Sequence, residues 1–186
     1  TAMARVVEEA GAVLWSVFYL VPVGRAAVGM LPSAEAVEAS LIELHRLARK
    51  APFAVKTTAA PHYRRVVLQA KKQLMTEGGP SAARAAVAVG LHGQHSLRVN
   101  DGRGFLFISH IGEIQPSGFL PITAGEVRTN DIVDVYRNHP IFRDLRSPEK
   151  IKGRCGICEY RDVCGGQRGR AYGMTGDYLE TDPACS

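Results

Sequence analysis

A run of apolar side chains near the start of the chain predicts its first buried strand. The segment 12–21 carries no charged residue and is rich in β-branched and aromatic side chains. Such a run is typical of a strand covered on both faces, as in a parallel sheet. We therefore expect a strand here with both faces buried, preceded at 1–10 by the end of a helix.

The next pattern has the period of a helix. Apolar residues recur at i, i+4, i+7 and i+11 within the segment 37–48, which places them on one helical face. Ser33 precedes this pattern and is a suitable N-cap. A short strand at 52–58 and a second helix at 61–75 are expected to follow. The order strand, helix, strand, helix predicts an α/β fold with a parallel sheet.

The second half of the chain follows a different pattern. A stretch rich in Gly, Ala and Pro leads into the segment 95–118, whose turn residues and alternating apolar positions predict a β-hairpin. The segment 130–145 reads as a helix that is capped by Asn130 or Asp131 and broken near Pro140. The chain therefore begins in one architecture and ends in another.

Composition narrows the class of protein. The chain has 186 residues, 46% of them hydrophobic, and a net charge of +5 with acidic and basic residues interspersed. That distribution indicates an ordinary solvated surface rather than a nucleic-acid face. The longest apolar run, 11–23, is too short to span a bilayer, and the N-terminal residues lack a secretory signal. We expect a cytoplasmic protein with no membrane partner.

All four cysteines lie near the C-terminus, in the spacing C-x2-C-x5-C-x20-C. Clustered thiols in a cytoplasmic protein more often bind metal than form disulfides. Two groups take four thiolates: a tetrahedral zinc ion and an iron–sulfur cluster. One C-x2-C pair followed by two more distant cysteines favours a [4Fe–4S] cluster. A non-enzymatic zinc module that binds a partner or nucleic acid remains the alternative. The four cysteines are Cys155, Cys158, Cys164 and Cys185.

The residues around these cysteines resemble a known family. The stretch KGRCGICEYRDVCGGQRGRAYGMTGDYLETDPAC is similar to the C-terminal SPASM-type extension of radical SAM enzymes. In pattern it is nearest to the radical SAM proteins of the haem d1 and alternative haem pathways. The stretches LWSVFYLVPVGR, VKTTAAPHYRRV and GFLFISHIGEIQPSGFLP also match, so the resemblance covers nearly the whole chain from Val13 to Cys185.

The resemblance implies a fold in two parts. The first is the tail of a partial (β/α)6 barrel with two strand-helix units, expected at 1–78. A linker or peripheral segment at 79–95 follows. The second part, at 96–186, would be a small SPASM-like α+β iron–sulfur module with a β-hairpin. The preceding barrel strands would then belong to a missing N-terminal half.

The resemblance also implies cofactors and partners. The four cysteines would bind one auxiliary [4Fe–4S] cluster, because Ser117 stands where a ligand of a second cluster would be. The chain has no C-x3-C-x2-C motif, so S-adenosylmethionine would bind only with the missing N-terminal half, and the chain alone would be inactive. An electron donor such as ferredoxin or flavodoxin is implied, with a tetrapyrrole or a peptide as substrate.

Two further groups of residues are candidates for the site. Arg168 and Arg170 would stabilise an anionic cluster, unless they are a surface pair, and the turn at Gly165 and Gly166 would let backbone N–H groups approach it. Functional groups of barrels lie at the C-terminal ends of strands, where they would face S-adenosylmethionine and substrate. The candidates at this rim are Gly24, Arg25, Lys56, Thr57 and His62.

Overall fold

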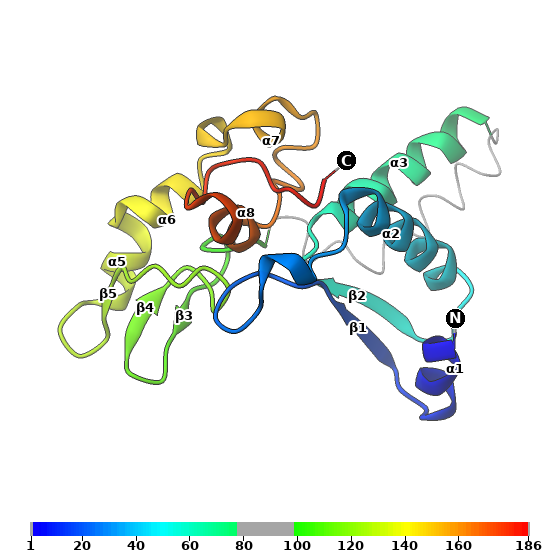
Figure 1. Cartoon of the computed structure of the whole chain (residues 1–186), viewed down its shortest axis with the longest axis horizontal. Coiled ribbons are helices and arrows are strands. Elements are labelled where there is room, and N and C mark those ends of the chain that lie inside the picture. Colours follow the sequence, from blue (N-terminus) through cyan, green and yellow to red (C-terminus); the bar gives the residue numbers. More distant parts are fainter. Residues whose placement is uncertain (1, 78–98, 186) are drawn as a thin grey trace.

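The computed structural model describes residues 2–77 and 99–185, so the whole of the expected linker at 79–95 lies outside the described residues. The chain has a mixed α/β fold with one parallel and one antiparallel sheet (Figure 1), which confirms the predicted class. The first half contains α1 (Ala2–Glu9), β1 (Leu14–Phe18), the 3-10 helix η1 (Val28–Met30), α2 (Ala34–Ala48), β2 (Ala54–Thr58) and α3 (His62–Glu77). The second half contains β3 (Phe107–Ile108), β4 (Glu113–Gln115), β5 (Gly125–Glu126), α5 (Ile132–Asn138), α6 (Pro140–Leu145), the 3-10 helix η3 (Pro148–Lys150), α7 (Gly153–Ile157) and α8 (Arg168–Thr175).

The parallel sheet consists of β1 and β2. Their register pairs Leu14 with Ala54 and Phe18 with Thr58, and α2 provides the crossover that a parallel pair requires. Figure 1 shows α2 and α3 together on one side of the two strands. The predicted order of strand, helix, strand and helix is therefore confirmed.

The expectation that β1 is buried on both faces is wrong. Exposure alternates along the strand, and Leu14 and Phe18 remain 50% and 55% exposed. Successive side chains of a strand point to opposite faces, and α2 and α3 lie on one side only. Every second side chain of β1 therefore faces away from the helices.

Helix α2 forms as its sequence pattern predicts. The Ser33 hydroxyl accepts a hydrogen bond of 3.2 Å from the Ala36 N–H, which caps the first turn. Val37, Leu41 and Leu44 are buried on one helical face, the first two in a core shared with α3. The predicted helix at 61–75 is also confirmed, as α3.

The second half is built around a small antiparallel sheet. Strands β3 and β4 form the predicted hairpin, and Gly112 in their turn has φ +96°. Strand β5, which the pattern did not predict, adds a third strand. Asp131 caps α5 as expected, accepting from the Asp134 N–H at 2.8 Å. The predicted break near Pro140 is confirmed, since α5 ends at Asn138 and a separate helix, α6, begins at Pro140. Ile114 and Phe142 are fully buried in the core of this half.

The two halves are in direct contact. The rings of Phe18 and Phe119 meet edge to face with centroids 5.2 Å apart. A methyl group on Gly173 of α8 would lie 2.6 Å from the Pro22 carbonyl oxygen, so α8 packs tightly against the loop that follows β1. In the described part of the chain, every helix is too short or too polar to cross a bilayer.

Candidate metal centre

All four cysteines line a single cavity of about 130 Å³. This cavity lies at the junction of the two halves of the chain. Cys155 lies in α7, Cys158 directly follows this helix, Cys164 precedes α8, and Cys185 lies in the C-terminal segment. One water molecule needs only about 10–15 Å³. The thiols therefore surround a space large enough for a group of several atoms.

The thiols are spread over the walls of this cavity. Within 2–77 and 99–185, no three Cys, His, Asp or Glu side chains come close enough together to hold one metal ion. The four cysteines thus surround one cavity, as metal binding requires, but their sulfurs do not converge on a single point within it.

A glycine turn forms one wall. Gly165 and Gly166 both have left-handed backbone conformations, with φ +64° and +65°. A methyl group on Gly166 would lie 3.1 Å from Cys155 Sγ and 2.8 Å from the Cβ of Asp182. Gly166 also donates its backbone N–H to the Cys164 thiol. The absent Cβ therefore lets the backbone approach the sulfurs of Cys155 and Cys164.

Two further backbone N–H groups approach cysteine sulfurs. Asp182 donates to Cys155 Sγ at 3.4 Å, and Tyr160 donates to Cys158 Sγ at the same distance. Burial raises the pKa of Cys164 to about 12, although the Gly166 N–H favours its thiolate. A metal that takes Cys164 as thiolate must therefore displace a proton on binding.

Three arginines also line the cavity, and the sequence pattern singled out none of them. Arg65 extends from the first turn of α3 and pairs with Glu38. Arg154 donates to the Cys185 carbonyl oxygen at 2.9 Å, and Arg161 lies between the second and third cysteines. Arg154 and Arg161 are close to cysteines in the sequence, and this closeness could have identified them as cavity residues. Arg65 is far from the cysteines in the sequence and reaches the cavity only because α3 packs there.

Arg168 lies behind the glycine turn rather than on the surface. It is 3% exposed and donates from Nη1 to the carbonyl oxygens of Tyr178 and Glu180, at 3.1 and 2.7 Å. A methyl group on Gly166 would lie 2.3 Å from Arg168 Nη2. One glycine therefore separates this guanidinium from the cavity, and the alternative of a surface pair of arginines is wrong.

Arg170 joins the two halves of the chain. Its Nη1 lies 3.0 Å from Asp182 Oδ2, and both side chains are buried. Its Nε donates to the Leu20 carbonyl oxygen at 3.1 Å, and its Nη2 donates to the Ala59 carbonyl oxygen at 2.7 Å. These two carbonyls follow β1 and β2, so Arg170 anchors α8 to the carboxyl ends of both parallel strands.

Asp182 connects Arg170 to the cavity. Its Oδ2 lies 3.1 Å from Nε2 of His62, a cavity-lining residue that is 1% exposed, and accepts from the Gln167 N–H at 2.6 Å. Burial alone would raise the pKa of Asp182, but His62 and the charge of Arg170 hold it well below its usual range. The carboxylate is thus held ionised beside the cysteines.

Of the five rim candidates, His62 is the one that borders the cavity. Lys56 is exposed, and the Thr57 hydroxyl donates at 3.1 Å to the Ala60 carbonyl oxygen, which follows β2. Gly24 and Arg25 lie exposed in the loop after β1, where Gly24 has φ +63°.

Ser117 is almost fully buried, at 1% exposure. Its hydroxyl accepts a hydrogen bond from the Phe119 N–H at 3.1 Å and so stabilises the turn after β4. Its side chain has a structural partner there. That the chain binds one cluster rather than two stays a prediction.

Curated proteins similar to this chain include several AdoMet-dependent heme synthases. An AdoMet-dependent heme synthase of Methanosarcina barkeri is 38% identical over 187 residues, covering 100% of this chain and 51% of the relative. This chain is a relative of the radical SAM enzymes. A pre-heme d1 synthase of Dinoroseobacter shibae is 36% identical over 45% of the chain and 22% of its own length. A PqqA peptide cyclase of Bradyrhizobium diazoefficiens is 35% identical over 46% and 24%.

The radical SAM resemblance predicted from the cysteine segment is thereby confirmed. The chain spans about half the length of the curated relatives it matches over its full extent. No protein-family profile matches it.

The cavity fits the kind of cofactor that radical SAM enzymes carry. Four thiols are the usual donor set of an iron–sulfur cluster, and N–H donors to sulfur together with nearby cations are what stabilise such an anionic group. The absent Cβ of Gly166 keeps open the space beside Cys155 Sγ that such a group would need.

Proposed function

We propose that this chain is the C-terminal part of a radical SAM enzyme and that its four cysteines bind one auxiliary [4Fe–4S] cluster. The observation that carries the proposal is that all four cysteines, distant in sequence by up to 30 residues, line one cavity of about 130 Å³. The ligands would be Cys155, Cys158, Cys164 and Cys185.

The spread of the thiols favours a cluster over zinc. Zn–S bonds of about 2.3 Å in a tetrahedron put neighbouring sulfurs about 3.8 Å apart, around one point. A cube-shaped cluster instead takes one thiolate at each of four separate iron corners. Thiols on the walls of a cavity of this size support the second arrangement.

The surrounding residues would hold and tune the cluster, which supplies electron transfer or a point for anchoring substrate. Backbone N–H groups from Tyr160, Gly166 and Asp182 would bind the cysteine sulfurs. Arg65 and Arg154 would offset the negative charge of four thiolates. Each of these groups stabilises the ligand sulfurs without itself binding iron.

The architecture fits this role. In this proposal 1–78 is the end of a partial (β/α)6 barrel, 79–95 is a linker, and 96–186 is a SPASM-like module. Support comes from β1, where Leu14 and Phe18 present exposed apolar surface on which an N-terminal half, in the same or a separate chain, would pack. S-adenosylmethionine would bind only in the presence of that half, and a cytoplasmic ferredoxin or flavodoxin would supply electrons.

The substrate would be a tetrapyrrole or a peptide. The names of the relatives support both, since they include heme synthases and a peptide cyclase. The match to heme synthases extends over the full chain, while the match to the peptide cyclase covers 46% of it. This difference favours a tetrapyrrole.

The test compares the chain alone with the chain plus a polypeptide carrying C-x3-C-x2-C and the preceding strands. After reduction and iron loading, S-adenosylmethionine is added and 5′-deoxyadenosine is measured. We expect none from the chain alone, because its four cysteines are all cluster ligands, and turnover from the pair. Catalytic amounts from the chain alone, abolished by Cys155→Ala, would contradict the assignment.

A further inference from the structure

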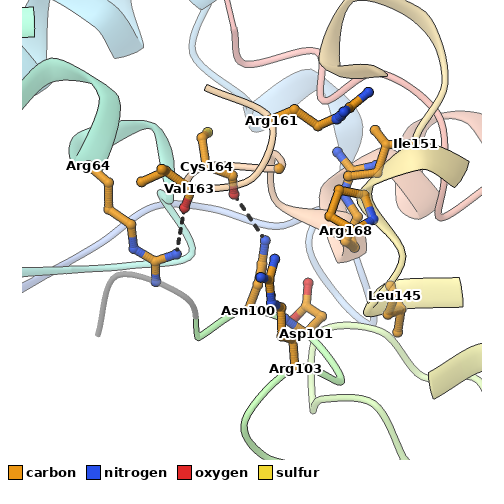
Figure 2. A pocket seen from close by; sticks show the side chains of 12 residues that line it. Arg64, Asn100, Asp101, Arg103, Leu145, Ile151, Arg161, Val163, Cys164 and Arg168 are labelled. Atoms are coloured by element: carbon orange, nitrogen blue, oxygen red, sulfur yellow. Dashed lines mark hydrogen bonds between the residues drawn. The ribbon is translucent and has the colours of Figure 1, made fainter. Parts of the chain in front are cut away.

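A second, smaller pocket lies behind the cysteine cavity and is lined by four arginines. Arg64, Arg103, Arg161 and Arg168 surround a space of about 20 Å³, together with Asp101. Figure 2 shows Arg64 entering from one side and Arg161 and Arg168 from the other, with Asp101 and Arg103 below. We call this space the arginine pocket.

The guanidinium groups of the arginine pocket contact backbone carbonyls rather than carboxylates. Arg64 donates to the Val163 carbonyl oxygen at 3.2 Å, and Arg103 donates to that of Asp162 at 3.4 Å. Arg161 likewise donates to a backbone carbonyl, at 2.9 Å. Across the described residues, every ion pair involves other arginines, lysines or His62. Four positive charges therefore gather without a direct counterion.

Two donors of these arginines are buried without a partner. They are Nε of Arg161 and Nη2 of Arg168, and the whole Arg168 residue is 3% exposed. A buried charged donor that lacks an acceptor carries a desolvation cost, so native structures rarely leave one without a purpose. Both residues line the arginine pocket, and Nη2 of Arg168 lies beside Gly166, on the side of the cysteine cavity.

The chain itself offers little negative charge to this pocket. Asp101 is the carboxylate among the lining residues, and it already accepts the Gly169 N–H at 3.1 Å. Burial raises the pKa of Asp101, which weakens it further as a counterion. The segment 78–98 contains neither Asp nor Glu. Within the described residues the charge of these four arginines thus lacks a full counterion, which a bound anion would supply.

We propose that the arginine pocket binds a single carboxylate group of a small molecule or substrate. Guanidinium groups present planar pairs of donors that match the two oxygens of a carboxylate. A space of about 20 Å³ holds one or two water-sized atoms. Two carboxylate oxygens fit that space, whereas the four oxygens of phosphate or sulfate exceed it. The size of the pocket thus selects carboxylate over the larger oxyanions.

The arginine pocket and the cysteine cavity share a wall. Arg161, Cys164 and Gly165 line both. If the proposed cluster is present, a carboxylate bound here adds negative charge next to it and disfavours its reduced, more anionic form. Bound carboxylate should then lower the midpoint potential of the cluster. This consequence alone rests on the proposed function; carboxylate binding itself does not.

The test follows the unfolding temperature of the iron-loaded chain as acetate replaces chloride at constant ionic strength. Arg103→Gln removes a pocket arginine that makes few contacts, and Arg25→Gln removes the same charge from an exposed loop. We expect Arg103→Gln to need roughly tenfold more acetate than the parent for the same rise in Tm, while Arg25→Gln behaves like the parent. Arg64→Gln, from a different element, should repeat the Arg103→Gln result.

Comparison between variants cancels the general stabilisation that such salts give. Equal responses to acetate in the parent, Arg103→Gln and Arg64→Gln would overturn the proposal. So would a response to phosphate that exceeds the response to acetate and depends on these arginines. If iron loading abolishes the acetate response, the arginines merely offset the charge of the cluster, and the proposal is again wrong.

Repeating the titration without iron separates the two proposals. The protein could respond to acetate in a way that depends on Arg103 and yet bind no iron. That result would support carboxylate binding in the arginine pocket and contradict the proposed cluster. In the loaded parent, saturating acetate should lower the midpoint potential, and Arg103→Gln should show a smaller shift at the same acetate concentration.

Discussion

Arg170 Nη1 lies 3.0 Å from Asp182 Oδ2, and the two side chains are 2% and 0% exposed. This buried pair joins α8 to the C-terminal segment that carries Cys185, and through Leu20 and Ala59 to the parallel strands. A charge at such depth depends on its partner, since water cannot replace it. The pair therefore ties the shape of the cysteine cavity to the fold of both halves.

Asp182→Ala should lower the free energy of unfolding of the chain by about 3–5 kcal/mol, because it leaves Arg170 buried without its counterion. Denaturant titration measures the loss. The control is Glu43→Ala, which breaks an ion pair whose side chains are 64% and 68% exposed and should cost less than about 1 kcal/mol. Similar losses of unfolding free energy in the two variants would show that Asp182 stabilises the fold no more than an exposed ion pair does.

Gly166→Ala should reduce cluster binding. Its methyl group would lie 2.3 Å from Arg168 Nη2 and 3.1 Å from Cys155 Sγ, in a backbone with φ +65°. Gly176→Ala is the matched control, since Gly176 has φ +76° but nothing within 4 Å of the added methyl. Both carry backbone strain of about 1–2 kcal/mol. Visible absorbance after reconstitution should fall in Gly166→Ala alone; equal absorbance in both variants would argue against a ligand beside Gly166.

Cys185→Ala should loosen the cluster and the C-terminal segment together. Cys185 follows the long excursion after Cys164 and so closes that loop around the metal. The remaining three-cysteine site should bleach faster in air, and 165–185 should become sensitive to protease, because metal binding and folding are linked. A variant that keeps the absorbance and protease resistance of the parent would show that Cys185 is not a ligand.

Arg154→Gln should lower the midpoint potential of the cluster. The guanidinium of Arg154 lines the cavity and donates to the Cys185 carbonyl oxygen, so it favours the more negative reduced state. We expect a shift of roughly 60 mV or less, since 59 mV is tenfold for a one-electron couple and water screens this exposed residue. Arg25→Gln should leave the potential unchanged in the same redox titration; equal shifts would indicate a general effect of net charge.

Local signals in the sequence predicted the elements whose structure is decided locally. Ser33 caps α2, and the helix that follows Asp131 breaks before Pro140, as their patterns indicated. The C-terminal cysteines line one cavity. Helix α8 was not predicted, because glycines interrupt its sequence. It forms with Gln167 as its cap and Arg168 and Arg170 buried in its first turn.

Long-range packing explains what the pattern missed. Arg65 reaches the cavity because α3 packs there. Asp182 is held beside the cysteines by two partners that are distant in sequence, His62 and Arg170. Both Arg65 and Asp182 lie in stretches that carry the family resemblance, but nothing in those stretches indicates which residues they contact. The error over β1 has a similar origin, since an apolar run such as that around Phe18 does not reveal what covers each face.

The central claim is that four cysteines hold one [4Fe–4S] cluster, and counting the metal tests it most directly. The chain is purified and reconstituted without oxygen, and iron, acid-labile sulfide and zinc are measured per chain alongside Cys164→Ala. The account predicts about four irons and four sulfides in the parent, little zinc, and a marked loss of iron in Cys164→Ala. A colourless protein with one zinc, or a reproducible value near eight irons, would contradict it.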